Sequence, residues 1–128
     1  MLSILDTSIL IGVEPSTIQG DLAISAVSIA ELHFGVLNAG SDEVRGKRLA
    51  RLSAIQSVFS PLPVDEFVAS SYGILAAATV SAGRKRQARS MDLMIAATAH
   101  AHQARLVTAN PKDVEHLRGL VDIFAVGR

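Results

Sequence analysis

Four carboxylates in this sequence stand where short apolar segments end or where helical patterns begin. Asp6 follows the apolar run of residues 2–5, Glu31 lies early in one helical pattern, and Asp92 and Asp113 lie early in later ones. Two carboxylates about 4 Å apart repel by on the order of 4 kcal/mol at an effective dielectric near 20, so such a group binds protons or holds a cation. An all-oxygen set in a chain without cysteine favours Mg²⁺ or Mn²⁺ over zinc.

Each carboxylate taken singly also has a structural explanation that needs no ligand. Asp6 could cap a helix, and Ser28 with Glu31 matches a capping box, in which the glutamate reaches back to a backbone N–H. Asp92 and Asp113 are placed like first-turn acids, whose charge complements the helix dipole. These explanations and a shared metal site stay open at this point.

The elements that position the carboxylates follow from the apolar pattern. Strands are predicted at residues 2–5, 22–25, 106–108 and 121–126. Helices are predicted at residues 7–11, 26–38, 41–60, 65–82 and 90–103. Glu14, Pro15 and Gly20 indicate a loop, residues 62–64 a brief extended crossing, and Asn110 with Pro111 the start of a last helical turn.

Strands that alternate with helices, without a hairpin signal, predict a parallel sheet flanked by helices. We therefore expect a three-layer α/β/α sandwich with a central parallel sheet of four to five short strands. In such a fold the helix starts that follow strands gather at one edge of the sheet, where Asp6 also emerges. The capping explanations themselves thus predict that the carboxylates converge.

Composition limits the class of protein. The 128 residues suffice for one domain, predicted to span residues 1–128. Twelve basic and twelve acidic side chains give zero formal charge, which argues neither for nor against nucleic acid. The absence of cysteine excludes disulfides and thiolate metal sites. No apolar run approaches the roughly 20 residues of a membrane span, and no basic region precedes the first apolar residues, so we expect a cytoplasmic protein without a membrane segment.

The hydropathy of the chain points to a protein partner. Hydrophobic residues make up 49% of the sequence and the mean hydropathy is +0.36, although aromatic residues make up only 4%. The excess is alanine and small aliphatic residues. Such a composition suits close-packed helices and leaves apolar surface for a partner.

Four short motifs along the whole chain match one family. They are Asp6-Thr7-Ser8 after the first strand, Ile-Ala-Glu-Leu around Glu31, Asp-Leu-Met-Ile-Ala-Ala-Thr-Ala from Asp92, and Leu-Val-Thr-Ala-Asn-Pro-Lys-Asp ending at Asp113. Together they resemble the PIN-domain ribonucleases, and most closely the VapC-type toxins of bacterial toxin–antitoxin pairs. The sequence departs from the family pattern at Val114, where many relatives have an aromatic residue.

The resemblance implies a Mg²⁺-dependent endoribonuclease whose products carry 5′-phosphate and 3′-hydroxyl ends. It implies that Asp6, Glu31, Asp92 and Asp113 surround the metal, and that Thr7, Ser8 and Asn110 support them. Mn²⁺ is expected to substitute for Mg²⁺. The resemblance also implies inhibition by a cognate antitoxin, and we expect a toxin homodimer in the complex.

Two clusters of basic residues are candidates for phosphate binding. One lies on the helix predicted at residues 41–60 and contains Arg45, Lys47, Arg48 and Arg51. The other precedes Asp92 and contains Arg84, Lys85, Arg86 and Arg89. A charge run is usually a solvated face, but the second cluster directly precedes the predicted active-site helix, so it is the candidate for holding RNA backbone.

Two other functions fit parts of the sequence. In an aspartate-dependent phosphotransfer or receiver-like domain, Asp6 would be phosphorylated. The sequence lacks the second aspartate two residues on, and no lysine follows the fourth strand at a suitable position. A catalytically silent PIN fold would only bind a partner. Metal-dependent cleavage of RNA distinguishes the ribonuclease from both.

Overall fold

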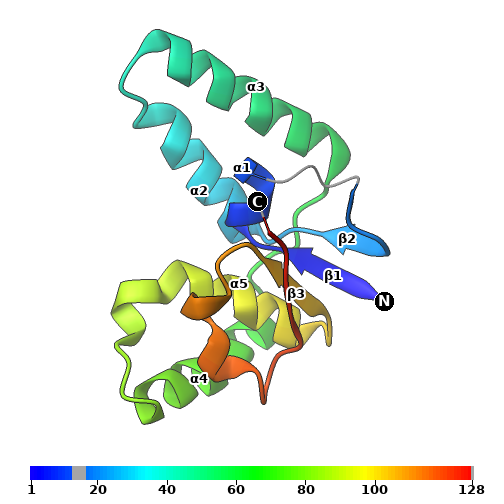
Figure 1. Ribbon diagram of the computed structural model, residues 1–128, viewed down its shortest axis with the longest axis vertical. Helices are drawn as coiled ribbons and strands as arrows, with labels where there is room; N and C mark the ends of the chain where they lie inside the picture. The colour runs from blue at the N-terminus through cyan, green and yellow to red at the C-terminus, as the bar shows by residue number, and fades with distance from the viewer. Residues whose placement is uncertain (13–16, 128) are drawn as a thin grey trace.

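The computed structural model describes residues 1–12 and 17–127, and a four-stranded parallel sheet lies at its centre (Figure 1). The strands are β1 (Leu2–Leu5), β2 (Asp21–Ala23), β3 (Arg105–Thr108) and β4 (Ile123–Ala125). Their order is β2-β1-β3-β4, and each neighbouring pair is parallel. Parallel neighbours need long crossover connections, and the segments between these strands supply them, mostly as helices.

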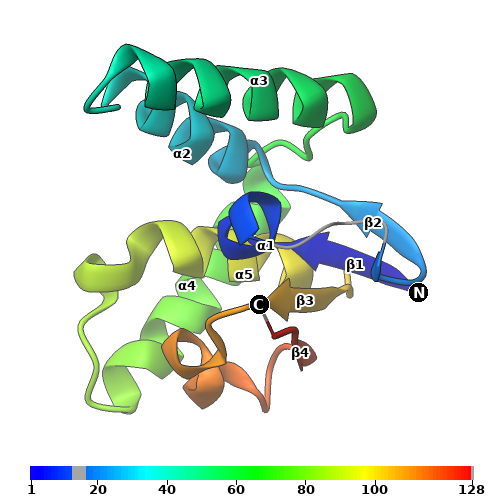
Figure 2. The ribbon, with the colours of Figure 1, turned by 45° about the horizontal axis from the view of Figure 1, so that its top comes forward.

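Helices cover both faces of the sheet, as Figures 1 and 2 show from two directions. On one face lie α1 (Thr7–Gly12), α2 (Ala26–Leu37) and α3 (Asp42–Val58), and on the other lie α4 (Glu66–Ser81) and α5 (Ser90–Ala101). Short 3₁₀ turns follow α4 and β3; they are η2 (Arg86–Arg89), η3 (Pro111–Asp113) and η4 (Glu115–Leu117).

Alternating side chains of the two central strands build a separate core on each face. Ile4 and Leu106 pack into the core shared with α4 and α5, whereas Leu5 and Val107 pack into the core shared with α2 and α3. Each of these four side chains is at most 1% exposed. A strand covered on both faces is mostly apolar, which explains Leu2, Ile4 and Leu5 in β1; Ser3 is the buried exception. The predicted three-layer fold is confirmed.

Side-chain caps define where three helices begin. Ser25, Ser41 and Asp65 cap α2, α3 and α4, and each accepts a backbone N–H at 2.9 to 3.2 Å. Ser41 and Asp65 lie at the first residues of the helices predicted at residues 41–60 and 65–82, so these two starts are confirmed. The predicted capping box of Ser28 and Glu31 is wrong, because Ser25 is the cap and Glu31 lies in the body of α2.

The extended segment before α4 fastens the start of α2 to the sheet. The Leu62 N–H donates to the Ile24 carbonyl at 2.8 Å, and the Ala26 N–H donates to the Leu62 carbonyl at 2.9 Å. Ser25 and Leu62 form an isolated parallel bridge. Pro63 has no N–H to donate to a ladder, so the segment stays a brief crossing, as predicted.

Several boundaries differ from the sequence prediction. α5 ends at Ala101 rather than at residue 103, because Gln103 has a φ of 51°, outside the helical region. β4 begins at Ile123, since the Val121 N–H still donates to the Leu117 carbonyl in the preceding turn. The loop predicted at Glu14 and Pro15 lies outside the described residues. None of the helices in the described ranges has the length and apolar character that a membrane crossing requires.

Candidate active site

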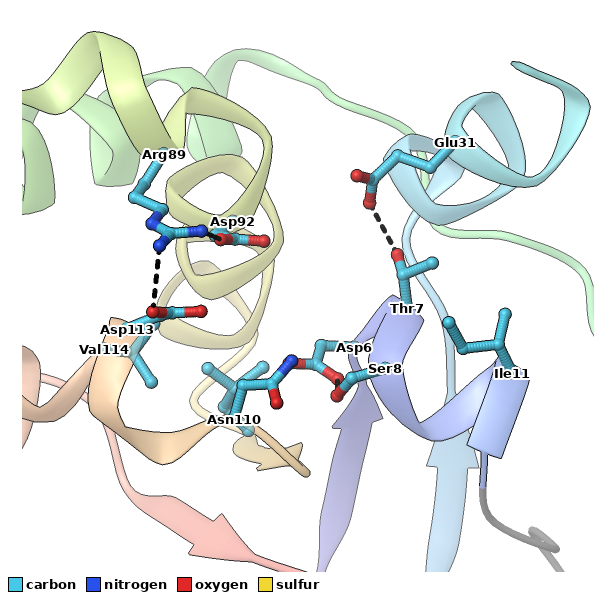
Figure 3. Close-up of a pocket in the computed structure, with 11 residues that line it drawn as sticks. Asp6, Thr7, Ser8, Ile11, Glu31, Arg89, Asp92, Asn110, Asp113 and Val114 are labelled. Atoms are coloured by element: carbon cyan, nitrogen blue, oxygen red, sulfur yellow. Dashed lines mark hydrogen bonds and ion pairs between the residues drawn. The ribbon is translucent and has the colours of Figure 1, made fainter. Parts of the chain in front are cut away.

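One pocket of about 210 Å³ opens where β1 and β3 end, and the four predicted carboxylates all line it (Figure 3). They come from four separate segments: the end of β1, the body of α2, the first turn of α5 and η3. The full lining is Asp6, Thr7, Ser8, Ile11, Glu31, Arg89, Asp92, Leu106, Asn110, Asp113 and Val114. The structure therefore brings together side chains that are far apart in sequence.

Asp6 is held at the junction of the two central strands. Its backbone N–H donates to the Val107 carbonyl at 3.0 Å, which continues the pairing of β1 with β3. Its Oδ1 accepts the Ser8 hydroxyl and, at 3.4 Å, the Ile9 N–H. Asp6 thus does contact the start of α1, as the capping explanation predicted. Within the described part of the chain these bonds all go to Oδ1, so Oδ2 is available to a ligand.

Ser8 links Asp6 to the far strand. Its hydroxyl donates to Asp6 and accepts the Ala109 N–H at 3.0 Å. Asn110, the next residue, donates its backbone N–H to the Thr108 hydroxyl at 3.0 Å. A buried serine in this position fixes the carboxylate and the chain after β3 to one another.

Thr7 holds Glu31 across the gap between α1 and α2, as Figure 3 shows. The Thr7 hydroxyl donates to Glu31 Oε1 at 2.6 Å, and it lies 3.1 Å from the Ser28 hydroxyl. A hydroxyl has one proton and an ionised carboxylate only accepts, so Ser28 donates to Thr7. Ser28 is fully buried, and its role is to orient Thr7 rather than to begin a helix.

Arg89 occupies the opposite side of the pocket. Its guanidinium lies 3.3 Å from Asp113 Oδ1 and 3.9 Å from Asp92 Oδ2. Among the cations predicted to hold RNA, Arg89 therefore points into the pocket, whereas Arg84 and Arg86 are exposed and do not line it. The sequence prediction missed these ion pairs. The spacing of Arg89 three residues before Asp92 was the available signal, because such pairs meet on a helix surface.

The pKa of the Asp92 carboxyl is raised above its ordinary value of 3.8, chiefly because burial removes water from it. The negative charges of Glu31, Asp113 and Asp6 raise this pKa further, while the Arg89 guanidinium opposes them. The carboxylates are therefore close enough to repel one another. Asp92 is the group on which that repulsion acts most clearly.

The donor set fits a small hard cation, because every side chain that could bind an ion in this pocket offers oxygen. Among residues 1–12 and 17–127, however, no three acidic or histidine side chains lie close enough together to hold one ion. Mg²⁺ commonly uses only one or two carboxylates and keeps several waters, so this spacing suits it. The Arg89 guanidinium lies beside Asp92 and Asp113 and offsets their negative charges, as a bound metal ion would.

Asp92→Asn is expected to raise the melting temperature at neutral pH in the absence of divalent cations. Between pH 3.8 and the raised pKa of Asp92, the folded protein binds more protons than the unfolded chain, so stability falls as pH rises through that window. Above this pH window the charged Asp92 lowers the stability of the wild-type protein. Below it, Asp92 is protonated in both the folded and the unfolded state, and the loss of stability disappears. Thermal unfolding in a chelator, from about pH 3 to pH 8, should show a gain that disappears at the acid end.

Asp65→Asn is the matched control for this measurement. It also removes one carboxylate, but Asp65 caps α4 outside the pocket, and asparagine caps a helix about as well as aspartate. An equal gain in both variants would show that the effect does not come from crowding in the pocket.

The chain matches known proteins along most of its length. The family described as PIN domain matches residues 3–119. Ribonuclease VapC8 of Mycobacterium tuberculosis is 38% identical over 100 residues, which cover 75% of this chain and 88% of that protein. Ribonuclease VapC4 of the same organism is 34% identical over 109 residues, covering 80% and 82%. The crystal structure of VapBC-5 from M. tuberculosis, a member of the VapBC family of toxin–antitoxin systems, matches with a TM-score of 0.84 and 30% identity over 99% of this chain and 98% of that one. The chain therefore belongs to the PIN-domain family and, within it, to the VapC ribonucleases.

Proposed function

We propose that this protein is a cytoplasmic endoribonuclease toxin that hydrolyses RNA phosphodiester bonds with Mg²⁺, and that a cognate antitoxin inhibits it. The observation that carries the proposal is the convergence of four carboxylates, from four separate segments, on one pocket. Mn²⁺ has similar oxygen chemistry and substitutes for Mg²⁺. Residues 1–128 form the single domain that contains this site.

Asp6 and Asp92 are the principal metal ligands in this proposal. A bound divalent cation supplies positive charge to the scissile phosphate and lowers the pKa of a water. Glu31 lies across the pocket from Asp92, where its carboxylate accepts a proton or orients the attacking water. Asp113 acts through water, since Arg89 already contacts it. Ser8 and Thr7 hold Asp6 and Glu31 in place through their hydroxyl groups.

RNA backbone binds near Arg84, Lys85 and Arg86 in this proposal. These side chains are exposed on the segment that leads from α4 to α5. Their charges suit phosphate, and phosphate contacts position a nucleic acid without reading its sequence. Arg89 lines the acidic pocket, so it is nearer to the cleavage point and would contact the scissile phosphate there.

The antitoxin binds exposed apolar surface on α2 and α4. Phe34 and Leu37 on α2 are 66% and 78% exposed, and Phe67 on α4 is 69% exposed. Large exposed apolar side chains of this kind suit an amphipathic helix of a partner. An arginine of the partner would then enter the acidic pocket and displace the metal. The resulting complex contains a toxin homodimer, which covers further apolar surface.

Asp6→Asn and Asp92→Asn are expected to fold but to lose RNA cleavage. Loss of an outer partner of a metal ligand commonly costs about 10–100-fold in activity, and loss of the ligand itself costs at least as much. The measurement is cleavage of a labelled RNA in Mg²⁺, with folding checked by circular dichroism. Asp65→Asn, outside the pocket, should cleave like the wild-type protein.

A different outcome would support a structural role for these carboxylates. If Asp6→Asn and Asp92→Asn both fold and cleave like the wild-type protein, capping explains these carboxylates and metal binding does not, because asparagine caps a helix about as well as aspartate.

Mg²⁺ or Mn²⁺ is expected to raise the melting temperature of the wild-type protein. A ligand that binds only the folded state stabilises it by RT ln(1 + [L]/Kd), which is about 2.7 kcal/mol at a hundredfold excess over Kd. The increase in melting temperature should be smaller in Asp92→Asn, which lacks one of the carboxylates proposed to bind the metal. It should grow in Arg89→Gln, because no guanidinium then competes beside Asp92 and Asp113. A melting curve that millimolar Mn²⁺ leaves unchanged contradicts a metal site.

Co-expression with the small protein encoded immediately upstream is expected to relieve growth inhibition by this chain. The same small protein should co-purify with it and suppress RNA cleavage. Asp92→Asn should be harmless when expressed alone yet still bind the partner. If the wild-type chain is a soluble monomer and no neighbouring small protein binds it, antitoxin control is excluded and the nuclease proposal is untouched.

A further inference from the structure

A second cleft, of about 600 Å³, adjoins the acidic pocket on the side of α2 and α3. The two share Thr7, Ile11 and Glu31, so the cleft continues directly from the pocket. Its outer wall is formed by α3, which contributes three cations: Lys47, Arg48 and Arg51. Glu31, at the junction, is the only acidic residue among the described lining residues.

The three cations share one face of α3. Lys47 and Arg51 are four residues apart, and Arg48 and Arg51 are three apart, so their side chains are neighbours on the helix surface. Arg48 is fixed over α2, because its guanidinium donates to the Gly35 carbonyl at 2.7 Å. Its other N–H groups stay available for an anion.

These cations have little compensation from acidic side chains. Lys47 lies 3.5 Å from Glu43, and both side chains are well exposed, so this pair is weak. Neither Arg48 nor Arg51 forms a side-chain ion pair with any residue that the structure describes. Arg45 differs, because it pairs with Asp42 at 2.8 Å, donates to the Ala39 carbonyl, and does not line the cleft.

We propose that Lys47, Arg48 and Arg51 bind phosphates of the RNA strand on the α2–α3 side of the cleaved bond. This inference rests on the proposed ribonuclease function. A polyanion that reaches the acidic pocket is long enough to extend into the adjoining cleft, where three cations meet its backbone. Ile11 and Leu32 in the cleft offer apolar contact to sugars and bases.

The inferred site gives the pocket a cationic surface on each side. Arg84, Lys85 and Arg86 belong to the layer of α4 and α5, whereas Lys47 and Arg51 belong to the layer of α2 and α3 (Figures 1 and 2). A strand that contacts both surfaces must cross the carboxylates between them. An acidic helix of a protein partner is the competing occupant of the cleft, and the experiment separates the two.

The test measures RNA binding by an Asp92→Asn protein, which keeps the RNA intact. A fluorescein-labelled single-stranded RNA of mixed sequence is titrated at several salt concentrations, with and without Arg48→Gln and Arg51→Gln together. Each phosphate contact on a single strand contributes about 0.7 to the slope of log K against log salt. The double substitution should therefore weaken binding and reduce the slope by about 1.4.

Two further variants make the result specific. Arg45→Gln removes a cation from the same helix outside the cleft and should leave the slope unchanged. Arg48→Lys with Arg51→Lys keeps both charges and should restore most of the slope. In the cleavage-competent protein, Arg48→Gln with Arg51→Gln should raise KM far more than it lowers kcat, because these residues lie away from the reacting phosphate.

An unchanged slope in the folded double variant overturns this inference while the ribonuclease function stands. The inference is also overturned if the double variant loses affinity for the upstream-encoded protein but binds RNA like its parent, since the cleft then holds a peptide. A wild-type protein that cleaves no RNA in Mg²⁺ or Mn²⁺ overturns the ribonuclease function itself, and this site with it.

Discussion

A partly buried carboxylate, Asp92, set beside three other acids is the constraint on which the pocket depends. Asp92 is partly buried, and Glu31, Asp113 and Asp6 all disfavour its charge. Each of these acids is attached to a packed element: the end of β1, α2, α5 or η3. None can move away without disturbing a core in which side chains such as Ile4 and Leu5 are fully buried. The fold therefore holds an unfavourable charge arrangement at a cost in stability, as enzymes commonly do at sites made for a ligand.

Small hydroxyl groups and one guanidinium make this arrangement tolerable. Ser8 and Thr7 each donate to one carboxylate; Ser8 also accepts the Ala109 N–H, and Thr7 also accepts the Ser28 hydroxyl. Arg89 compensates the remaining two acids from a turn that immediately precedes α5. The supporting groups thus lie on the same segments as the carboxylates. A cation held by Asp92 or Asp113 would compete with Arg89, which already contacts both.

The sequence predicted the layers, the parallel sheet and the strand ends that meet at the pocket, because apolar periodicity and helix caps are local signals. The cap at Asp65 and the apolar run of β1 are examples. The prediction placed the helix cap at Ser28, but Ser25, three residues earlier, is the cap of α2. The contact of Ser28 with Thr7 is tertiary, so the local sequence could not decide which serine caps the helix. The prediction also grouped Arg89 with the neighbouring basic residues and missed its ion pairs with Asp92 and Asp113. The direction of that side chain depends on η2, a short turn without a strong sequence signal.

The order of the strands has a consequence for synthesis of the protein. β1 is the first strand made, but its neighbours in the sheet are β2 and β3, and β3 begins only at Arg105. Long-range parallel pairing of this kind forms late and slowly. A nascent chain that still lacks residues 105–113 has neither the second central strand nor Asp113, and Ser8 has no Ala109 N–H to bind. The acidic pocket therefore cannot form until residues 105–113 have been synthesised and β3 has paired with β1.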